Sequence, residues 1–435
     1  MKALFLSTSD VVGGAARATF WLARGLREIG EDVSMGVQRK SGDYSWTWTA
    51  ERGRLSKVFD SFRTPIDSLP LRRYPDRKRA QWSLNLLPNS NLTAAVSQQR
   101  PDIVNLHWVG DGFLPIAAFR KLPAPIVWSL YDMWAFSGGC HYDDFCGRHA
   151  ESCGSCPQLK ATGQDISNYI WHRKKKLWQG LPMTIVAPST WLAQEARKSS
   201  LFQDLRVEII PHGTDLNVFK PIAKGLAREI LGLPSERRII LFGAMGGTGD
   251  DRKGYQYLEP ALKRLASQGS HGDISLAIFG ASEPRKVPNL GFPVHYLGRL
   301  HDDVSLAVLY AAADVTVTPS MQEAFGMTAS ESLACGTPVV AFGATGPLDV
   351  IDHKINGYLA RPYDEADLAE GIAWVLDNSA SSGLGAAGRK KCEQNFELHK
   401  VSRQYLALYE ELIVEHTPSP RRGKSVARAA ATPLG

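Results

Sequence analysis

Short apolar runs alternate with amphipathic helical stretches along most of this chain, and the alternation occurs twice. The candidate strands lie at 3–7, 103–106, 126–129 and 184–187 in the first half, and at 239–242, 274–279, 315–318 and 339–342 in the second. Strands that alternate with helices form parallel sheets, which helices cover on both faces. The pattern therefore predicts an α/β protein built from two doubly wound, Rossmann-like domains that face one another across a cleft.

The length of the chain also favours two domains. A single hydrophobic core rarely organises as many as 435 residues. We place the boundary near residue 210, where Pro211 and Gly213 suit a hinge. The expected units are a first, acceptor-side domain at 1–210, a second, nucleotide-sugar-binding domain at 211–395, a helix at 396–416 that packs back on the first domain, and a disordered basic tail at 417–435.

The segment 39–91 breaks the alternation. It is rich in arginine, lysine, tryptophan and phenylalanine, and four prolines interrupt any long helix in it. We interpret it as a basic insertion in the first domain. Basic residues interleaved with aromatic residues suit anionic interfaces, so the segment is either a solvated excursion or a surface that faces the acceptor or a membrane.

Charge and hydropathy exclude some classes of function. The formal net charge of +6 is modest for this length, so it permits contact with anionic lipid and does not point to a nucleic-acid partner. No apolar run approaches the roughly 20 residues of a spanning helix, and the apolar start at 3–6 is too short for a secretory signal. We expect a cytoplasmic protein that can make peripheral contact with the inner face of the membrane.

The stretch that ends at Glu331 carries the most informative chemistry. Glu323 lies in a predicted loop after a strand, and Glu331 lies inside the helix that follows. The backbone amides of Phe325, Gly326 and Met327 would be free at the helix N-terminus, which is a ready anion site. A carboxylate on each side of these amides suits a nucleotide-sugar, in which a sugar and a ribose flank a diphosphate. The alternative is that both glutamates are ordinary surface or capping residues.

This stretch resembles the signature of glycosyltransferase family 4, in which two glutamates are also separated by seven residues. The following segments, Leu333–Ala341 and Asn356–Leu359, resemble the family's continuation. The resemblance implies the GT-B fold. It also implies a retaining glycosyltransferase that moves a sugar from a UDP- or GDP-sugar to a glycan or lipid-linked acceptor, with no cofactor required for catalysis.

The resemblance further implies roles for individual residues. Glu331 would bind the ribose hydroxyls, and Glu323 would contact the donor sugar, while the three amides between them would bind the sugar and the phosphates. Lys253 matches the family lysine that neutralises the diphosphate as it leaves. Gly13 and Gly14 match a glycine loop that lies against the donor phosphates and the acceptor, although glycine pairs also occur in ordinary turns.

Two positions depart from the family pattern. Ala244 stands where relatives carry an arginine, and Arg252 is the residue that could supply the missing charge. Tyr131, which precedes Asp132, stands where many relatives have a histidine that touches the donor sugar. A tyrosine still offers a hydroxyl. His107, after the preceding predicted strand, is a further cleft candidate, although a lone histidine beside a strand is more often structural.

Two alternative functions therefore stay open. One is a catalytically silent relative that binds a nucleotide-sugar or a glycan. The other is a nucleotide-sugar epimerase of the same fold. The two departures favour the silent relative, whereas the combination of Glu323, Glu331 and Lys253 favours an active transferase.

Four of the six cysteines crowd into a short segment of the first domain. Cys140, Cys146, Cys153 and Cys156 are separated by five, six and two residues. In a reducing compartment such crowding favours a metal site over disulfides. A structural zinc ion is one interpretation, and disulfides or free buried thiols are the others. The surrounding stretch resembles an insertion in polysaccharide-making members of the family, including the colanic acid group, which implies a role in surface or exopolysaccharide biosynthesis.

Overall fold

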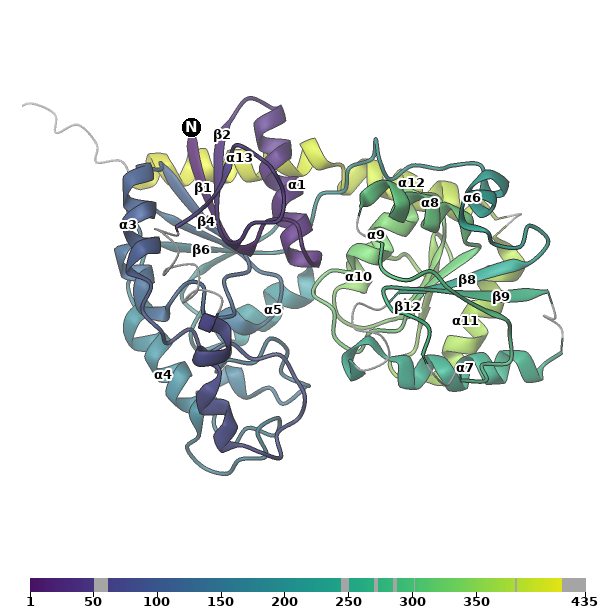
Figure 1. The fold of residues 1–435 in the computed structure, drawn as a ribbon, viewed down its shortest axis with the longest axis horizontal. Coiled ribbons are helices and arrows are strands. Elements are labelled where there is room, and N and C mark those ends of the chain that lie inside the picture. Colours follow the sequence, from purple (N-terminus) through teal and green to yellow (C-terminus); the bar gives the residue numbers. More distant parts are fainter. Residues whose placement is uncertain are drawn as a thin grey trace, which may run out of the picture.

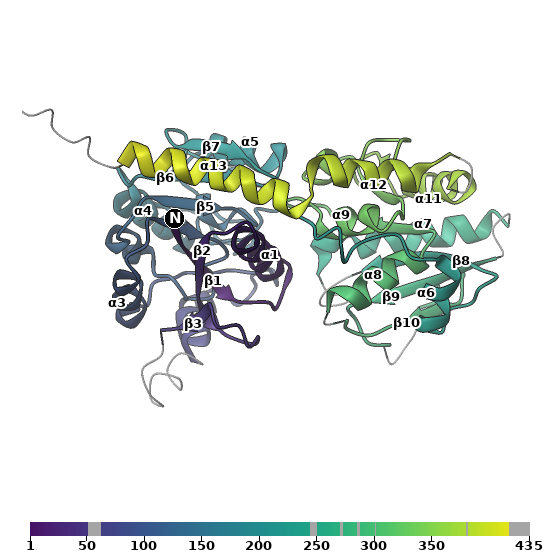
Figure 2. The same ribbon diagram turned by 90° about the horizontal axis from the view of Figure 1, so that it is seen from above.

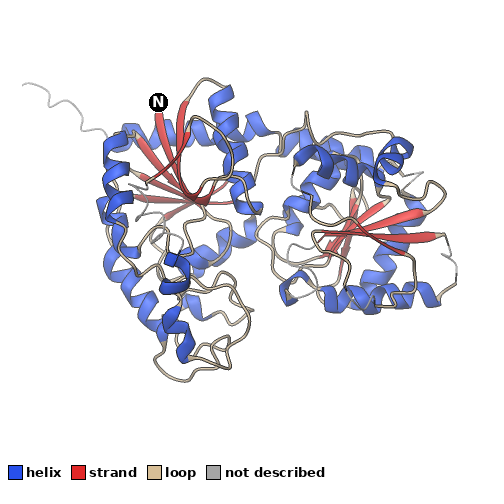
Figure 3. Ribbon diagram, in the orientation of Figure 1, coloured by secondary structure: helices blue, strands red, loops and turns tan. Residues whose placement is uncertain are grey.

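Two separate parallel sheets form the centres of the two halves of this computed structural model (Figure 1). In each half, helices enclose the strands (Figure 3). The structure describes residues 1–50, 62–243, 250–269, 273–284, 288–300, 302–379 and 382–416. The predicted α/β fold with two Rossmann-like domains is confirmed.

The N-terminal domain is built on a seven-stranded sheet with the order β3-β2-β1-β4-β5-β6-β7. Its strands are β1 (Lys2–Ser9), β2 (Asp32–Arg39), β3 (Thr47–Thr49), β4 (Ile103–Leu106), β5 (Ile126–Ser129), β6 (Met183–Ala187) and β7 (Arg206–Ile209). Its α-helices are α1 (Gly14–Glu28), α3 (Ser90–Gln99), α4 (Ile166–Trp178) and α5 (Thr190–Lys198), and 3₁₀ helices lie at η1 (Leu69–Arg73), η2 (Ile116–Lys121), η3 (Trp134–Phe136) and η4 (Arg148–Ala150). The strands β4, β5 and β6 are buried along their whole length, because other elements cover both faces of the sheet.

The C-terminal domain is built on a six-stranded sheet with the order β10-β9-β8-β11-β12-β13. Its strands are β8 (Arg238–Gly243), β9 (Ile274–Phe279), β10 (Val294–Tyr296), β11 (Val315–Thr318), β12 (Val339–Phe342) and β13 (Gly357–Ala360). Its helices are α6 (Lys224–Leu231), η6 (Asp251–Lys253), α7 (Tyr255–Ser267), α8 (Asp303–Ala312), α9 (Met327–Ala334), α10 (Pro347–Val350), α11 (Glu365–Asn378) and α12 (Leu384–Asn395).

The segment 39–91 is not wholly an insertion, which corrects our interpretation of its composition. The strand β3 lies inside it and pairs with β2 in parallel, with Met35 opposite Thr47. Neither strand has a continuous apolar run. β3 lies at the edge of the sheet, and β2, which lies between β3 and β1, carries the partly exposed Ser34 and Gln38 between its buried residues. The part of the segment at 51–61 lies outside the described residues.

The last helix, α13 (Leu398–His416), lies across the N-terminal domain, where Figure 2 shows it in yellow. It packs on α1, and its Tyr405, Tyr409 and Leu412 join the apolar core under the first sheet. The hydroxyl of Tyr405 lies 3.0 Å from that of Ser129 at the end of β5. The C-terminal end of the described chain thus contributes to the core of the N-terminal domain. The predicted disordered tail at 417–435 lies outside the described residues.

None of the helices in the described part of the chain has the length and apolar composition that a membrane crossing requires.

Candidate active site

Glu323 lies beside two cations at the carboxyl end of the C-terminal sheet. The Nζ of Lys253 donates a hydrogen bond to Glu323 Oε2 at 2.7 Å, and Nη1 of Arg252 lies 3.7 Å from the same oxygen. Burial alone would raise the pKa of Glu323, but the charges of Lys253 and Arg252 outweigh it and lower the pKa below its ordinary value. The carboxylate is therefore ionised at neutral pH.

A glycine allows these groups to meet. Gly254 follows η6 with a φ of +75°, and a Cβ at that position would lie 1.8 Å from the carbonyl oxygen of Pro319. Because glycine lacks that atom, η6 packs directly on the loop after β11, where the Met321 amide donates to the Arg252 carbonyl at 2.8 Å. The sequence Lys253-Gly254 thus positions the lysine against the loop at 319–326, which carries Glu323 and is called the glutamate loop.

Glu331 is buried inside α9 and is held from both domains. The hydroxyl of Tyr310 donates to Glu331 Oε2 at 2.7 Å, and Nη2 of Arg17 lies 3.1 Å from Oε1. Arg17 also pairs with Asp303 at 2.8 Å, and Trp21 Nε1 donates to that aspartate at 2.9 Å. Burial raises the pKa of Glu331, and Arg17 and Tyr310 offset this only in part. The N-terminal domain therefore contacts the predicted ribose-binding carboxylate.

Sequence reasoning did not single out Arg17. Its one local signal was its position on the first turn of the helix that follows the glycine pair. The pairing with Glu331 forms only when the two domains come together. The spacing of residues along the chain does not predict that contact.

Two helices start near these groups without a capping side chain. α9 begins after Gly326, whose φ of +103° favours glycine, and no side chain caps the helix. α1 begins after Gly13, with a φ of +101°, and it also has no side-chain cap. A Cβ added at Gly13 or Gly14 would meet no atom within 4 Å, so this loop borders open space. Uncapped helix N-termini favour anions such as phosphate. Phe325, by contrast, is buried and packs edge-on against Phe396.

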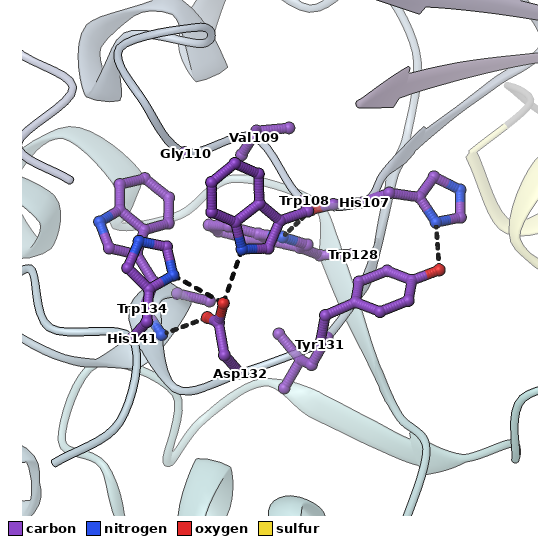
Figure 4. Close-up of a pocket in the computed structure, with 11 residues that line it drawn as sticks. His107, Trp108, Val109, Gly110, Trp128, Tyr131, Asp132, Trp134 and His141 are labelled. Atoms are coloured by element: carbon purple, nitrogen blue, oxygen red, sulfur yellow. Dashed lines mark hydrogen bonds and ion pairs between the residues drawn. The ribbon is translucent and has the colours of Figure 1, made fainter. Parts of the chain in front are cut away.

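Tyr131 does not offer its hydroxyl to a ligand in this structure. Thr19 Oγ1 donates to it at 3.1 Å. His107 Nδ1 also lies 3.1 Å from it, as Figure 4 shows. The ring stacks on His212 at 4.8 Å between centroids. Burial, together with the neighbouring His212, lowers the pKa of His107 well below its ordinary value, so His107 is neutral. The tyrosine and His107 therefore form a packed junction inside the N-terminal domain.

Asp132 organises a buried network beside that junction (Figure 4). Its Oδ2 accepts hydrogen bonds from Trp108 Nε1 at 2.7 Å and lies 2.6 Å from His141 Nδ1, while Ser83 Oγ lies 2.8 Å from His141 Nε2. The order Ser-His-Asp is that of hydrolase triads. However, Ser83 is only 2% exposed and its oxygen accepts the Asp111 amide at 2.9 Å. No substrate carbonyl could approach it, so we interpret the network as structural.

The four clustered cysteines are free thiols in this structure. Burial and the neighbouring thiols raise the pKa of Cys146 to about 11 and that of Cys153 to about 12. In the part of the chain that the structure describes, no three histidine, cysteine, aspartate or glutamate side chains are arranged to hold a metal ion. The disulfides considered from the sequence are therefore not formed by these four cysteines. Among the described residues, their side chains are also not arranged as a zinc site.

Comparisons with known families match both halves of the chain. The family described as Glycosyltransferase Family 4 matches residues 12–218, and the family described as Glycosyl transferases group 1 matches residues 224–395. A D-inositol 3-phosphate glycosyltransferase from Xylanimonas cellulosilytica is 31% identical over 220 residues, which cover 47% of this chain and 51% of the relative. A protein of the same name from Geodermatophilus obscurus is 31% identical over 229 residues, 50% of each chain. The chain thus spans about half the length of the curated relatives it matches.

Solved structures resemble this one over nearly the whole chain. A sucrose-phosphate synthase from Thermosynechococcus elongatus superposes with a TM-score of 0.67 at 20% identity, covering 95% of this chain and 100% of that structure. HepE from Anabaena in complex with UDP-glucose gives a TM-score of 0.64 at 18% identity, with coverage of 95% and 100%. At about 20% sequence identity, such a similarity is evidence for the fold alone. It confirms the two-domain GT-B architecture that the family resemblance implied.

Proposed function

Because this chain belongs to glycosyltransferase family 4, we propose that it transfers a sugar from a nucleotide-sugar donor to a hydroxyl of a glycan or lipid-linked acceptor, with retention of the anomeric configuration. One observation carries the proposal. Two carboxylates, the half-buried Glu323 and the buried Glu331, flank an uncapped helix N-terminus, and each is paired with a cation. This arrangement suits a donor whose diphosphate lies between two hydroxyl-bearing groups.

In the proposed complex Glu323 contacts the donor sugar and Glu331 binds the ribose. The amides at the start of α9 bind the diphosphate, together with the cations Lys253 and Arg252. Arg252 supplies the charge that relatives place just after the strand β8; Ala244, which stands at that position, lies outside the described residues. The glycine loop at Gly13 borders the donor phosphates and the acceptor.

The proposed reaction needs no metal ion, because fixed cations and amides stabilise the charge that grows on the departing diphosphate. The bond between the anomeric carbon and the phosphate oxygen breaks through an oxocarbenium-like state. The acceptor hydroxyl attacks the anomeric carbon from the face that the diphosphate leaves, and the departing phosphate takes the proton of that hydroxyl. Glu323 is paired with Lys253 and does not form a covalent intermediate in this scheme. Closure about the hinge near Pro211 excludes water from the reacting groups.

Calorimetric titration of the purified protein with a panel of UDP-, GDP- and ADP-sugars tests the proposal. We expect saturable binding of one nucleotide class, with UDP-glucose as the first candidate, because a solved structural neighbour is a complex with it. Incubation with that donor and trial acceptors, including D-inositol 3-phosphate, should then release the nucleoside diphosphate. Binding without turnover would favour the silent relative, and conversion of the free donor to an epimer would favour the epimerase.

A structural zinc ion at the four clustered cysteines stays a prediction of the sequence. It is supported by the proximity of these thiols, since, in addition to burial, Cys146, Cys153 and Cys156 each raise the pKa of Cys140. If the prediction is correct, elemental analysis of protein purified without chelators will find one zinc ion per chain. A content well below one would leave free thiols as the interpretation. The membrane contact and the place in polysaccharide biosynthesis also stay predictions.

A further inference from the structure

A loop of the N-terminal domain, residues 142–145, contacts the C-terminal domain beside the glutamate loop. Both ends of the Gln322 side-chain amide bind this loop: Nε2 donates to Asp143 Oδ1 at 2.8 Å, and the Asp144 amide donates to Oε1 at 3.1 Å. Gln322 is only 3% exposed, so both hydrogen bonds are shielded from water. Since Gln322 immediately precedes Glu323, the loop is attached directly to the candidate donor site.

The same loop carries the ring against which Arg252 lies. The Arg252 guanidinium carbon is 4.4 Å from the centroid of the Tyr142 ring. Nη1 of Arg252 donates to the Gln322 carbonyl at 3.0 Å, and Nη2 donates to Asp250 at 3.1 Å. A cation over an aromatic face is attracted by the ring quadrupole, most strongly where water is excluded. Tyr142 therefore fixes one face of a guanidinium whose edge is directed toward the glutamate loop.

The loop is itself held firmly in the N-terminal domain. The Asp143 carboxylate accepts the Phe145 and Gly147 amides at 3.1 and 2.9 Å, and it lies 3.4 Å from His149 Nδ1. Burial alone would raise the pKa of Asp143, but the adjacent His149 and the hydrogen bond from Gln322 outweigh it and lower the pKa to about 2. The carboxylate that holds Gln322 is therefore charged throughout the physiological range.

We propose that Tyr142 is a positioning residue that holds Arg252 at the diphosphate end of the donor site, so that a ring of the N-terminal domain orders a cation that the C-terminal domain contributes to the site. The inference rests on the proposed function, because it needs a donor with a diphosphate. Its physical basis is preorganisation. An arginine side chain loses rotamer freedom when it binds a phosphate, and a ring that already fixes the guanidinium removes part of that loss before the donor arrives.

The test measures donor affinity in Tyr142→Leu and Tyr142→Phe by calorimetry, with UDP-glucose as the first probe. Tyr142→Leu removes the ring, and we expect the dissociation constant to rise about 3- to 30-fold, with KM for the donor rising more than kcat falls. Tyr142→Phe keeps the ring, so its affinity should stay within about threefold of the wild type. Tyr169→Leu, at an exposed tyrosine of the same domain, is the matched control.

A double substitution separates positioning from a general loss of structure. If Tyr142 acts through Arg252, then adding Tyr142→Leu to Arg252→Met should weaken binding no further than Arg252→Met alone. Additive losses, or unchanged affinity in Tyr142→Leu, would overturn the inference while the wild type still binds donor. Should Tyr142→Leu fail to fold, Gln322→Leu breaks the attachment of the same loop and should raise the dissociation constant similarly. A folded wild type that binds no nucleotide-sugar would instead refute the proposed function.

Discussion

Replacing Lys253 with methionine should lower kcat/KM for sugar transfer by about 10²- to 10³-fold, the usual cost of removing one group that stabilises a developing negative charge. In the proposed reaction the diphosphate departs with growing charge, and Lys253 is one of two cations beside the glutamate loop. Methionine has a similar length and no charge. The variant should still fold, because the Nζ of Lys253 makes its hydrogen bond with a partly exposed carboxylate and not in the apolar core. Initial rates over a range of donor concentrations measure the effect.

Lys263→Met is the matched control for this prediction. Lys263 lies on α7 of the same domain and pairs with Glu259 at 2.7 Å on the exposed surface, where such pairs contribute little. We expect its rate to stay within about twofold of the wild type, and Lys253→Arg to retain part of the activity because the charge remains. If Lys253→Met keeps a rate close to that of the control, Lys253 does not stabilise the leaving group.

Glu331→Gln should weaken donor binding by about 10- to 100-fold, because hydrogen bonds to a charged group contribute about 1.5–3 kcal/mol each. Glutamine keeps the shape of the side chain but loses the charge that would accept hydrogen bonds from the ribose. Arg17 would keep Asp303 as its partner, so the contact between the domains should persist. Calorimetric titration with the nucleoside diphosphate of the preferred donor measures the loss.

An analogue identifies the part of the donor that Glu331 binds. The wild type should bind the 2′,3′-dideoxy nucleoside diphosphate more weakly than the parent nucleotide, whereas Glu331→Gln should bind both with nearly equal affinity. Equal discrimination in the two proteins would show that Glu331 does not contact the ribose. Glu393→Gln, which removes an exposed carboxylate paired with Arg389 at 2.7 Å, should behave as the wild type does.

Much of the fold could be predicted from local patterns. The apolar runs at 3–7 and 339–342 correspond to β1 and β12, because a strand buried on both faces needs a nearly continuous apolar stretch. The strands β2 and β3 were not predicted, because partly exposed polar side chains interrupt their apolar residues. β3 lies at the edge of the sheet, and β2 is the strand next to it. Full burial at the centre of a sheet leaves a continuous apolar stretch in the sequence, whereas partial exposure near the edge does not.

The features of the candidate site also fall into two groups, those that local motifs predict and those that depend on tertiary contacts. Glu323, Glu331 and Lys253 could be proposed from short motifs that resemble those of glycosyltransferase family 4, because each motif folds as a local unit beside the end of a strand. The orientation of the Tyr131 hydroxyl could not, since it depends on Thr19 and His107 from other elements. The residue type determines which hydrogen bonds a side chain can make. The neighbouring residues in the fold determine which of these bonds form.

Local patterns were sufficient to predict the two-domain α/β architecture, and motifs that resemble those of the family pointed to the glutamates, lysine and glycines of the candidate donor site. The contact of Arg17 with Glu331 and that of Tyr142 with Arg252 appear only in the tertiary structure. Gln322 and Asp143, which make a neighbouring contact between the domains, are 179 residues apart in the chain. Such contacts depend on how two independently patterned domains meet, and the complementarity of their surfaces leaves no regular spacing in the sequence.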